Sequence, residues 1–264
     1  MSTTFKDKVL AGKTAFIAGA SSGINLGIAQ RYAAEGAKVF LLSRSEDKLS
    51  AAAATISDAG GEVAYAPADV RNYDAVAAAF VQAEAAFGKI DIVVSGAAGN
   101  FVAAARGMSA NGFKAVIDID LIGTFNVLHA SFEHLNSDGA SLINITAPQA
   151  VAPQPFQSHV CAAKAGINML TQCLAMEWGP ANIRVNAISP GPIADTEGMA
   201  RLAPTPEIEQ KYKSMLALRE YGNKSDIADL AVFLATPAAR YITGTIVDCD
   251  GGTKLGDASA NALP

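Results

Sequence analysis

Short runs of apolar and β-branched residues alternate with longer, alanine-rich segments along this chain. The short runs are apolar on both alternating sets of positions, which is typical of strands buried on both faces of a sheet. They predict seven strands, at residues 14–18, 38–43, 63–66, 90–94, 141–146, 184–188 and 245–248.

The longer segments carry apolar residues at helical spacing, and we predict helices at 28–35, 47–59, 74–87 and 164–178. Strands that alternate with helices indicate a parallel sheet covered on both faces. Right-handed crossovers then give a doubly wound α/β fold of the Rossmann type. No linker, repeat or charge block divides residues 1–264, so we expect a single domain. In it, the proline-rich stretch 190–206 and the helices that follow, to about residue 222, cover the substrate side.

Composition narrows the class of protein. Half of the 264 residues are hydrophobic and 17% are charged, which allows a large buried core. The net charge of −5 gives no basic surface for nucleic acid. No apolar run approaches the roughly 18–20 residues needed to cross a bilayer, and neither terminus has a signal core or a peroxisomal address. We therefore expect a soluble, cytoplasmic protein without a nucleic-acid or membrane partner.

The cysteines and histidines do not form a metal-binding pattern. Cys161, Cys173 and Cys249 are odd in number and widely spaced. His129 and His134 are five residues apart, which does not match the i,i+4 spacing of a metal pair on a helix. We expect neither a disulfide framework nor a metal site.

A glycine-rich turn, residues 19–27, joins the first strand to a helix. Glycines let backbone N–H groups approach a pyrophosphate, and the start of a helix adds positive potential. The turn stands about 20 residues before the second strand, as in dinucleotide-binding folds. We predict a nucleotide site here, with a plain tight turn as the alternative, and its residues are Gly19, Ser21, Ser22, Gly23 and Ile24.

The end of the second strand indicates which nucleotide is bound. An acid at Ser43 would bind the ribose hydroxyls and repel a 2′-phosphate, but here a guanidinium, Arg44, follows a serine. This favours NADP(H), unless Arg44 is an ordinary surface arginine. Asp69, after the third strand, is placed to accept from the adenine amino group, and we assign Val70 to the same nucleotide site.

Together these segments resemble the short-chain dehydrogenase/reductase family over about residues 8–252. Further matching segments are 95–99, 144–146, 183–186, 190–193 and 250–252. The resemblance implies that Ala97 lies in the nucleotide site. It also implies that Pro190, Gly191 and Ile193 border the nicotinamide carboxamide, with Thr196 near its phosphate end.

The catalytic set that this family carries is mostly replaced. Its Asn, Ser, Tyr and Lys positions fall on Asp120, Ala147, Val160 and Lys164, so only the lysine remains. Reduction of a ketone puts charge on the carbonyl oxygen, and a positioned acid contributes about 10²–10⁴-fold to such a step. Because the hydroxyls at 147 and 160 are missing, we do not expect ordinary ketone reduction.

The glycine-rich turn also departs from the family. Asn25 occupies the usual third glycine, and Ala18 the usual preceding threonine. Asparagine adopts unusual backbone angles more readily than most residues, so we expect nucleotide binding to be retained.

One branch of the family fits better. Residues 97–101, 117–126 and 177–180, with 191–193, 196–198 and 201–202, resemble the 2,4-dienoyl-CoA reductases of the peroxisomal type. These also lack the tyrosine and keep the lysine. The resemblance implies reduction of a 2,4-dienoyl-CoA by NADPH to a 3-enoyl-CoA in unsaturated fatty acid β-oxidation. Hydride goes to the δ carbon and the charge spreads over a dienolate, so no phenol is required.

Three residues are assigned to the chemistry. We expect Lys164 to bind the nicotinamide ribose and stabilise the dienolate, and Asp120 to accept from Lys164 or from a water that relays the proton. Asn100 is expected to donate to the thioester or to the ribose. The alternatives are a surface lysine, a polar residue with a local partner and a loop turn.

Other side chains are weaker candidates. The later tyrosines Tyr212, Tyr221 and Tyr241 are possible proton donors, whereas His159 lies about 100° around the helix from Val160 and is expected to face elsewhere. Thr146 is the hydroxyl nearest to the lost serine position. Candidates for the CoA phosphates are Arg201, Lys211 and Lys213, unless they are simply solvated.

Two other functions stay open. One is an oxidoreductase of the same family acting on another carbonyl or conjugated substrate. The other is a catalytically silent NADP(H)-binding sensor. The family resemblance further implies a homotetramer in which helices around residues 113–134 and 157–178 lie between subunits.

Overall fold

The computed structural model describes residues 8–196, 198–199, 203 and 205–260. Within them, parallel strands form one sheet in the order β3-β2-β1-β4-β5-β6-β7. The strands are β1 (Thr14–Ala18), β2 (Lys38–Ser43), β3 (Val63–Pro67), β4 (Ile92–Ser95), β5 (Ala140–Ile145), β6 (Ile183–Pro190) and β7 (Ile246–Cys249). The predicted doubly wound α/β fold is confirmed.

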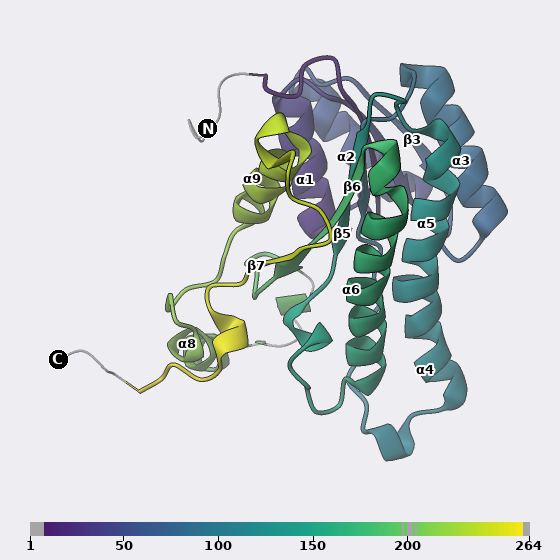
Figure 1. Cartoon of the computed structure of the whole chain (residues 1–264). Coiled ribbons are helices and arrows are strands. Elements are labelled where there is room, and N and C mark those ends of the chain that lie inside the picture. The colour runs from purple at the N-terminus through teal and green to yellow at the C-terminus, as the bar shows by residue number, and fades with distance from the viewer. Residues whose placement is uncertain (1–7, 197, 200–202, 204, 261–264) are drawn as a thin grey trace.

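Helices cover both faces of the sheet (Figure 1). They are α1 (Gly23–Ala34), α2 (Glu46–Asp58), α3 (Tyr73–Phe87), α4 (Ala110–Val116), α5 (Gly123–Ser131), α6 (Ser158–Trp178), α8 (Pro206–Met215) and α9 (Lys224–Ala235). One core joins the sheet to α1, α2 and α9, and a second joins it to α3, α5 and α6. In β1, Ile17 packs in the first core and Phe16 in the second, which is why successive strand positions are apolar.

The predicted boundaries differ from the observed ones where polar residues begin an element. Helix α1 begins at Gly23 rather than at residue 28, and α6 begins at Ser158 rather than at 164. The first turns of both helices lack the apolar spacing from which we predicted them. Strand β4 begins at Ile92, not at residue 90, because Ile90 forms only an isolated bridge to Leu135.

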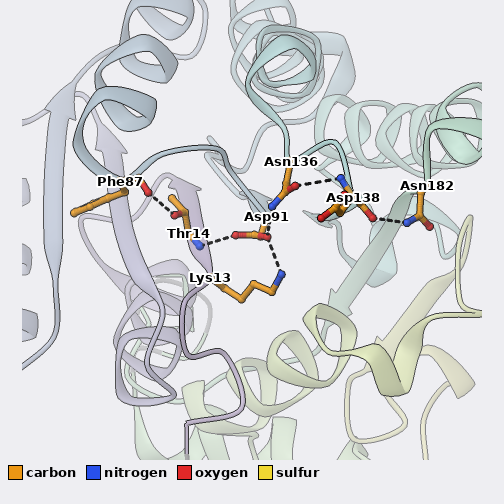
Figure 2. A network of polar contacts seen from close by, with 7 residues as sticks. All are labelled: Lys13, Thr14, Phe87, Asp91, Asn136, Asp138 and Asn182. Atoms are coloured by element: carbon orange, nitrogen blue, oxygen red, sulfur yellow. Dashed lines mark hydrogen bonds and ion pairs between the residues drawn. The ribbon is translucent and has the colours of Figure 1, made fainter.

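A buried carboxylate fixes the amino-terminal edge of the sheet (Figure 2). Asp91 accepts from Lys13 Nζ at 2.8 Å, from the Thr14 backbone N–H at 2.9 Å and from Asn136 Nδ2 at 3.1 Å. The polar network continues to Asn182 at the turn before β6. It ties together the segments that enter β1, β4, β5 and β6, at the edge opposite the carboxyl ends of the strands.

One helical stretch, Ala110–His134, is long and apolar enough to cross a membrane by these two criteria alone. We did not predict it, because the sequence has no uninterrupted apolar run of that length. Half of its most apolar window is buried inside the protein, and its α5 part packs against α3. Core helices of soluble proteins pass the same test, so this is weak evidence for a membrane span.

Candidate active site

A cavity of about 1440 Å³ lies at the carboxyl edge of the sheet. It spans the ends of β1 and β4, where the strand order reverses and open α/β sheets bind their ligands. The structure brings together in its walls all the residues predicted for nucleotide binding: Gly19, Ser21, Ser22, Gly23, Ile24, Arg44, Asp69, Val70, Ala97, Lys164, Pro190, Gly191, Ile193 and Thr196. Asp120 and Asn100 line it too.

The glycine-rich turn has the shape of a phosphate cradle. Gly19 has φ +80°, and a Cβ atom there would lie 2.8 Å from the backbone nitrogen of Ala97. Gly23, at the start of α1, has φ +63°. Ser22 caps α1 without a side-chain hydrogen bond, so backbone N–H groups of the first turn remain available to an anion. These residues fit the pyrophosphate of a nicotinamide nucleotide.

Asn25 is accommodated for a different reason from the one we predicted. It lies in the first turn of α1 and is not among the positive-φ residues, so unusual backbone angles play no part. Its Nδ2 donates to the Gly96 carbonyl oxygen at 2.8 Å and to that of Gly19 at 3.4 Å. The buried Oδ1 has no hydrogen-bond partner among the described residues. Asn25 thus ties the end of β1 to the end of β4.

Asp69 has a partner that we did not predict, Arg71, which is not among the residues that line the cavity. Arg71 binds Asp69 through Nε at 3.0 Å and Nη2 at 2.6 Å, and its backbone N–H also donates at 3.0 Å. These hydrogen bonds, together with the charge of Arg44, hold the pKa of Asp69 below its usual value. Asp69 lines the site as predicted, but Arg71 already holds its carboxylate. The Asp-x-Arg spacing was the signal that we overlooked.

Lys164 and Asp120 form the buried polar centre of the cavity. Lys164 Nζ donates to the Ile145 carbonyl oxygen at 3.1 Å and lies 3.2 Å from Asp120 Oδ2. Both side chains are almost fully buried. The sequence had left open a surface position for Lys164, and its burial excludes that alternative.

Asp120 owes its position to an irregular turn. It lies in a π-helical turn, Ile117–Ile122, between α4 and α5, and such turns are frequent at functional sites. Its Oδ1 accepts from the Gly99 backbone N–H at 2.7 Å. Its Oδ2 makes the ion pair with Lys164 but no aligned hydrogen bond within the described residues. Oδ2 is therefore a buried acceptor that no described hydrogen bond fills.

The wall next to this pair is apolar. Ala147 and Val160 both line the cavity, where the lost hydroxyls would stand. Thr146, the nearest hydroxyl, donates to the Lys164 carbonyl oxygen at 3.4 Å. That bond commits its proton to the α6 backbone. Asn100, on the exposed loop after β4, makes no side-chain hydrogen bond within the described residues.

The candidate tyrosines differ in position. Tyr212 on α8 lines the cavity, whereas Tyr221 and Tyr241 do not. Burial raises the pKa of Tyr221, and its hydroxyl has no partner among the described residues. Tyr241 is 95% exposed, just before β7, so it is not a proton donor for this site. His159 packs on Phe101, with ring centroids 4.3 Å apart, and faces away from the cavity, as expected.

The basic residues considered for the CoA phosphates lie in different places. Lys211 lines the cavity from α8. Lys213 pairs with Glu209 at 2.6 Å and lies 5.0 Å from the centre of the Tyr221 ring. Arg201 lies outside the described residues. Among the side chains that the structure describes, no group of three His, Cys, Asp or Glu could hold a metal ion.

Two glutamines of the site were missed by the sequence analysis. Gln149 and Gln157 line the cavity, and Gln149 Nε2 donates to Gln157 Oε1 at 3.2 Å. Gln157 is 3% exposed. Its place seven residues before Lys164, next to the start of the helix that carries this lysine, was the available signal.

Comparisons with known proteins agree with this geometry. Residues 19–254 match the family model described as Enoyl-(Acyl carrier protein) reductase. The chain is 42% identical to the peroxisomal 2,4-dienoyl-CoA reductase, (3E)-enoyl-CoA-producing, of Rattus norvegicus, covering 95% of this chain and 87% of that protein. It is 38% identical to the protein of the same name from Arabidopsis thaliana, covering 97% and 89%.

A solved structure gives the same result. The short-chain dehydrogenase/reductase from Serratia marcescens superposes with a TM-score of 0.86 at 31% identity, covering 93% of this chain and 99% of that one. Sequence relatives and fold thus agree, and the nucleotide cradle matches the nicotinamide cofactor that the family implies. This chain belongs to the short-chain dehydrogenase/reductase family.

Proposed function

We propose that this protein is an NADPH-dependent 2,4-dienoyl-CoA reductase that forms a 3-enoyl-CoA in the β-oxidation of unsaturated fatty acids. The observation that carries the proposal is the buried Lys164–Asp120 pair beside a wall without hydroxyls at 147 and 160. The names of the two relatives support the same substrate. Arg44 at the adenosine end supports the choice of NADPH over NADH.

The reaction balances with one proton from water. A nicotinamide held beside Pro190, Gly191, Ile193 and Lys164 would supply a hydride, and thus two electrons, for the δ carbon of the dienoyl thioester. The two conjugated double bonds become one β,γ double bond, and negative charge moves toward the thioester. A proton added at the α carbon completes the 3-enoyl product.

Lys164 and Asp120 have separable roles in this reaction. The Lys164 ammonium stabilises the negative charge that develops at the thioester end, an effect that is strong in a buried site. Asp120 is assigned the water that relays the proton, because its Oδ2 accepts no hydrogen bond from the described residues and Lys164 Nζ adjoins it at 3.2 Å. We assign to this water the delivery of a proton, replaced from the solvent, to the α carbon. Asn100, at the exposed mouth, is the candidate donor to the thioester or the ribose.

The substrate side of the cavity suits an acyl-CoA. Helix α8 contributes Ile208, Tyr212 and Met215 to an apolar wall, and Lys211 adds a positive charge. We assign the acyl chain to the apolar wall and a CoA phosphate to Lys211.

The test is to mix purified protein with NADPH and a 2,4-dienoyl-CoA and to follow NADPH consumption and the position of the product double bond. Turnover to a 3-enoyl-CoA is expected. Turnover of 3-oxoacyl-CoA or simple ketones alone would instead identify another oxidoreductase of this family. Nucleotide binding without any turnover would identify a silent NADP(H) sensor.

A homotetramer is the assembly we propose. Helices α4, α5 and α6, and the turn after α5, expose large apolar side chains, among them Phe113, Phe125, Phe132, Met169 and Met176. Such patches are typical of subunit interfaces. Light scattering of the purified protein would measure the mass of the assembly, and a monomer would contradict this proposal.

The location of the protein needs its own experiment. The sequence predicts a cytoplasmic protein, and the peroxisomal names of the two relatives do not support that prediction. Fractionation of the source cells, followed by detection of the protein, would decide.

A further inference from the structure

An amide stands at the start of α6, the helix that carries Lys164. Gln157 is the N-cap residue directly before Ser158, and it lines the cavity together with Val160 and Lys164. Gln157 is 3% exposed, whereas Asn100 lies on an exposed loop. Gln157 is therefore a buried polar group in the wall that lost its hydroxyls.

Gln157 is held so that its donors stay available. Its Oε1 accepts from Gln149 Nε2 at 3.2 Å. A primary amide carries two N–H donors, and no described residue accepts from Gln157 Nε2. Both of its N–H groups are thus available to a ligand in the cavity.

The backbone before Gln157 adopts a disfavoured conformation. Phe156 has φ +66°, which is unusual for a bulky residue, and its carbonyl oxygen accepts from the Ala103 backbone N–H at 3.0 Å. Such strain persists where the surrounding structure enforces it, and it clusters at functional sites. Here it places Gln157 at the start of α6, beside Gln149.

The polar groups next to Gln157 in this wall already have protein partners. Lys164 Nζ bonds the Ile145 carbonyl oxygen and faces Asp120, and the Thr146 hydroxyl donates to the α6 backbone. A developing enolate oxygen needs fixed donors in a buried site. An amide supplies a hydrogen bond without giving up a proton, which suits a reaction whose proton ends on the α carbon.

We propose that the Gln157 carboxamide, positioned by Gln149, donates the hydrogen bond to the thioester carbonyl oxygen of the substrate, in place of the hydroxyls that are missing at 147 and 160. This inference rests on the proposed function, because it names the group that binds its substrate. Gln157 is a catalytic residue in this assignment, and Gln149 is a positioning residue. No covalent bond to either glutamine forms or breaks.

The experiment records the ultraviolet absorption of a 2,4-dienoyl-CoA bound to the protein with oxidised nucleotide, where no turnover occurs. A hydrogen bond to the carbonyl polarises the conjugated chromophore and shifts its absorption to longer wavelength. We expect this shift with the wild type and its loss in Gln157→Leu and Gln157→Glu. Glutamate still accepts from Gln149 but carries no amide donors, so it separates donation from packing.

Kinetics and a matched control complete the test. Both Gln157 variants are expected to lower kcat at least tenfold with a smaller change in KM, and Gln149→Leu to have a weaker effect. Gln30→Leu breaks another 3.2 Å amide hydrogen bond, to Thr55 on the outside of the molecule, and should change neither the shift nor kcat. Thermal melts of each variant exclude unfolding.

Two outcomes separate the hypotheses. If the wild type reduces dienoyl-CoA, but both Gln157 variants keep the absorption shift and kcat within about twofold, the assignment of Gln157 is wrong and the proposed function stands. If the wild type neither binds nor reduces dienoyl-CoA, the proposed function fails, and the assignment fails with it.

Discussion

The carboxamide of Asn25 fills the space in which a side chain at position 96 would begin. A Cβ atom on Gly96 would lie 2.6 Å from Asn25 Cγ, closer than real Cβ atoms approach other atoms. Asn25 Nδ2 also donates to the Gly96 carbonyl oxygen. A side chain at 25 and the absence of one at 96 are therefore coupled, although 71 residues separate them.

This coupling predicts the behaviour of a double variant. Gly96→Ala should lower the free energy of unfolding by about 1–3 kcal/mol through overpacking, and should weaken NADPH binding. Adding Asn25→Gly should recover much of both losses, because the space is vacated. Chemical denaturation and NADPH titration of the two single variants and the double variant measure the effect; additive losses would contradict it.

The buried ion pair predicts two losses of activity. Lys164→Ala and Asp120→Ala should each lower kcat for dienoyl-CoA at least tenfold, because charge stabilisation and the water relay are lost. Asp120→Asn keeps an oxygen for the Gly99 N–H and should still lose turnover. The wild type should turn over dienoyl-CoA with Val160 in place, so the Val160→Tyr substitution is not required for activity. Full activity of Asp120→Asn in steady-state assays would argue against the water relay.

The adenosine end predicts a change of nucleotide. Arg44→Ala should weaken NADPH binding about tenfold or more, the order expected for loss of a charge-assisted hydrogen bond to the 2′-phosphate, and should leave NADH binding nearly unchanged. Ser43→Asp should add preference for NADH by accepting from the ribose hydroxyls. Fluorescence titration with both nucleotides measures this. If Arg44→Ala weakened the binding of NADPH and NADH equally, Arg44 would be a contact to an anion that both nucleotides share.

The network around Asp91 predicts a loss of stability without a loss of activity. Asp91→Ala removes the acceptor shared by the Lys13 side chain, the Thr14 N–H and the Asn136 amide. The Thr14 N–H is buried, and leaving a buried donor without a partner costs roughly 1–3 kcal/mol, whereas the half-exposed Lys13 ammonium can turn to solvent and adds less. We expect a lower melting temperature, with NADPH affinity unchanged at the far edge of the sheet. Unchanged melting would contradict this role.

Asp69 predicts a defined acid sensitivity. Hydrogen bonds from Arg71 lower its folded pKa beneath the ordinary value of 3.8. A carboxyl with a depressed folded pKa adds stability that is fully present above the unfolded pKa and is lost as pH falls through the folded pKa. The stability difference between wild type and Asp69→Asn should therefore shrink as the pH falls below about 4. Denaturation curves at several pH values measure the free energy of unfolding of both proteins. A difference between them that stays constant below pH 4 would contradict this prediction.

Local patterns were sufficient for much of the fold. The observed ranges of β1 and β2 match the predicted ones, because strands buried on both faces are apolar at successive positions. The glycine-rich turn could be recognised in the sequence because its position 19 must be a glycine. Gly19 approaches the backbone of Ala97, and this leaves no space for a Cβ atom. The first turns of α1 and α6 were missed, because small and polar residues begin these helices.

The sequence by itself determined which catalytic groups are missing, since Ala147 and Val160 have no hydroxyls in any fold. It also indicated Lys164 and Asp120 as the residues that remain. Only the tertiary structure decided which separate segments meet, as where Asn25 binds the Gly96 carbonyl oxygen and Gln149 binds Gln157. Local periodicity reports which face of an element is buried, whereas these contacts depend on how loops and crossovers bring strand ends together.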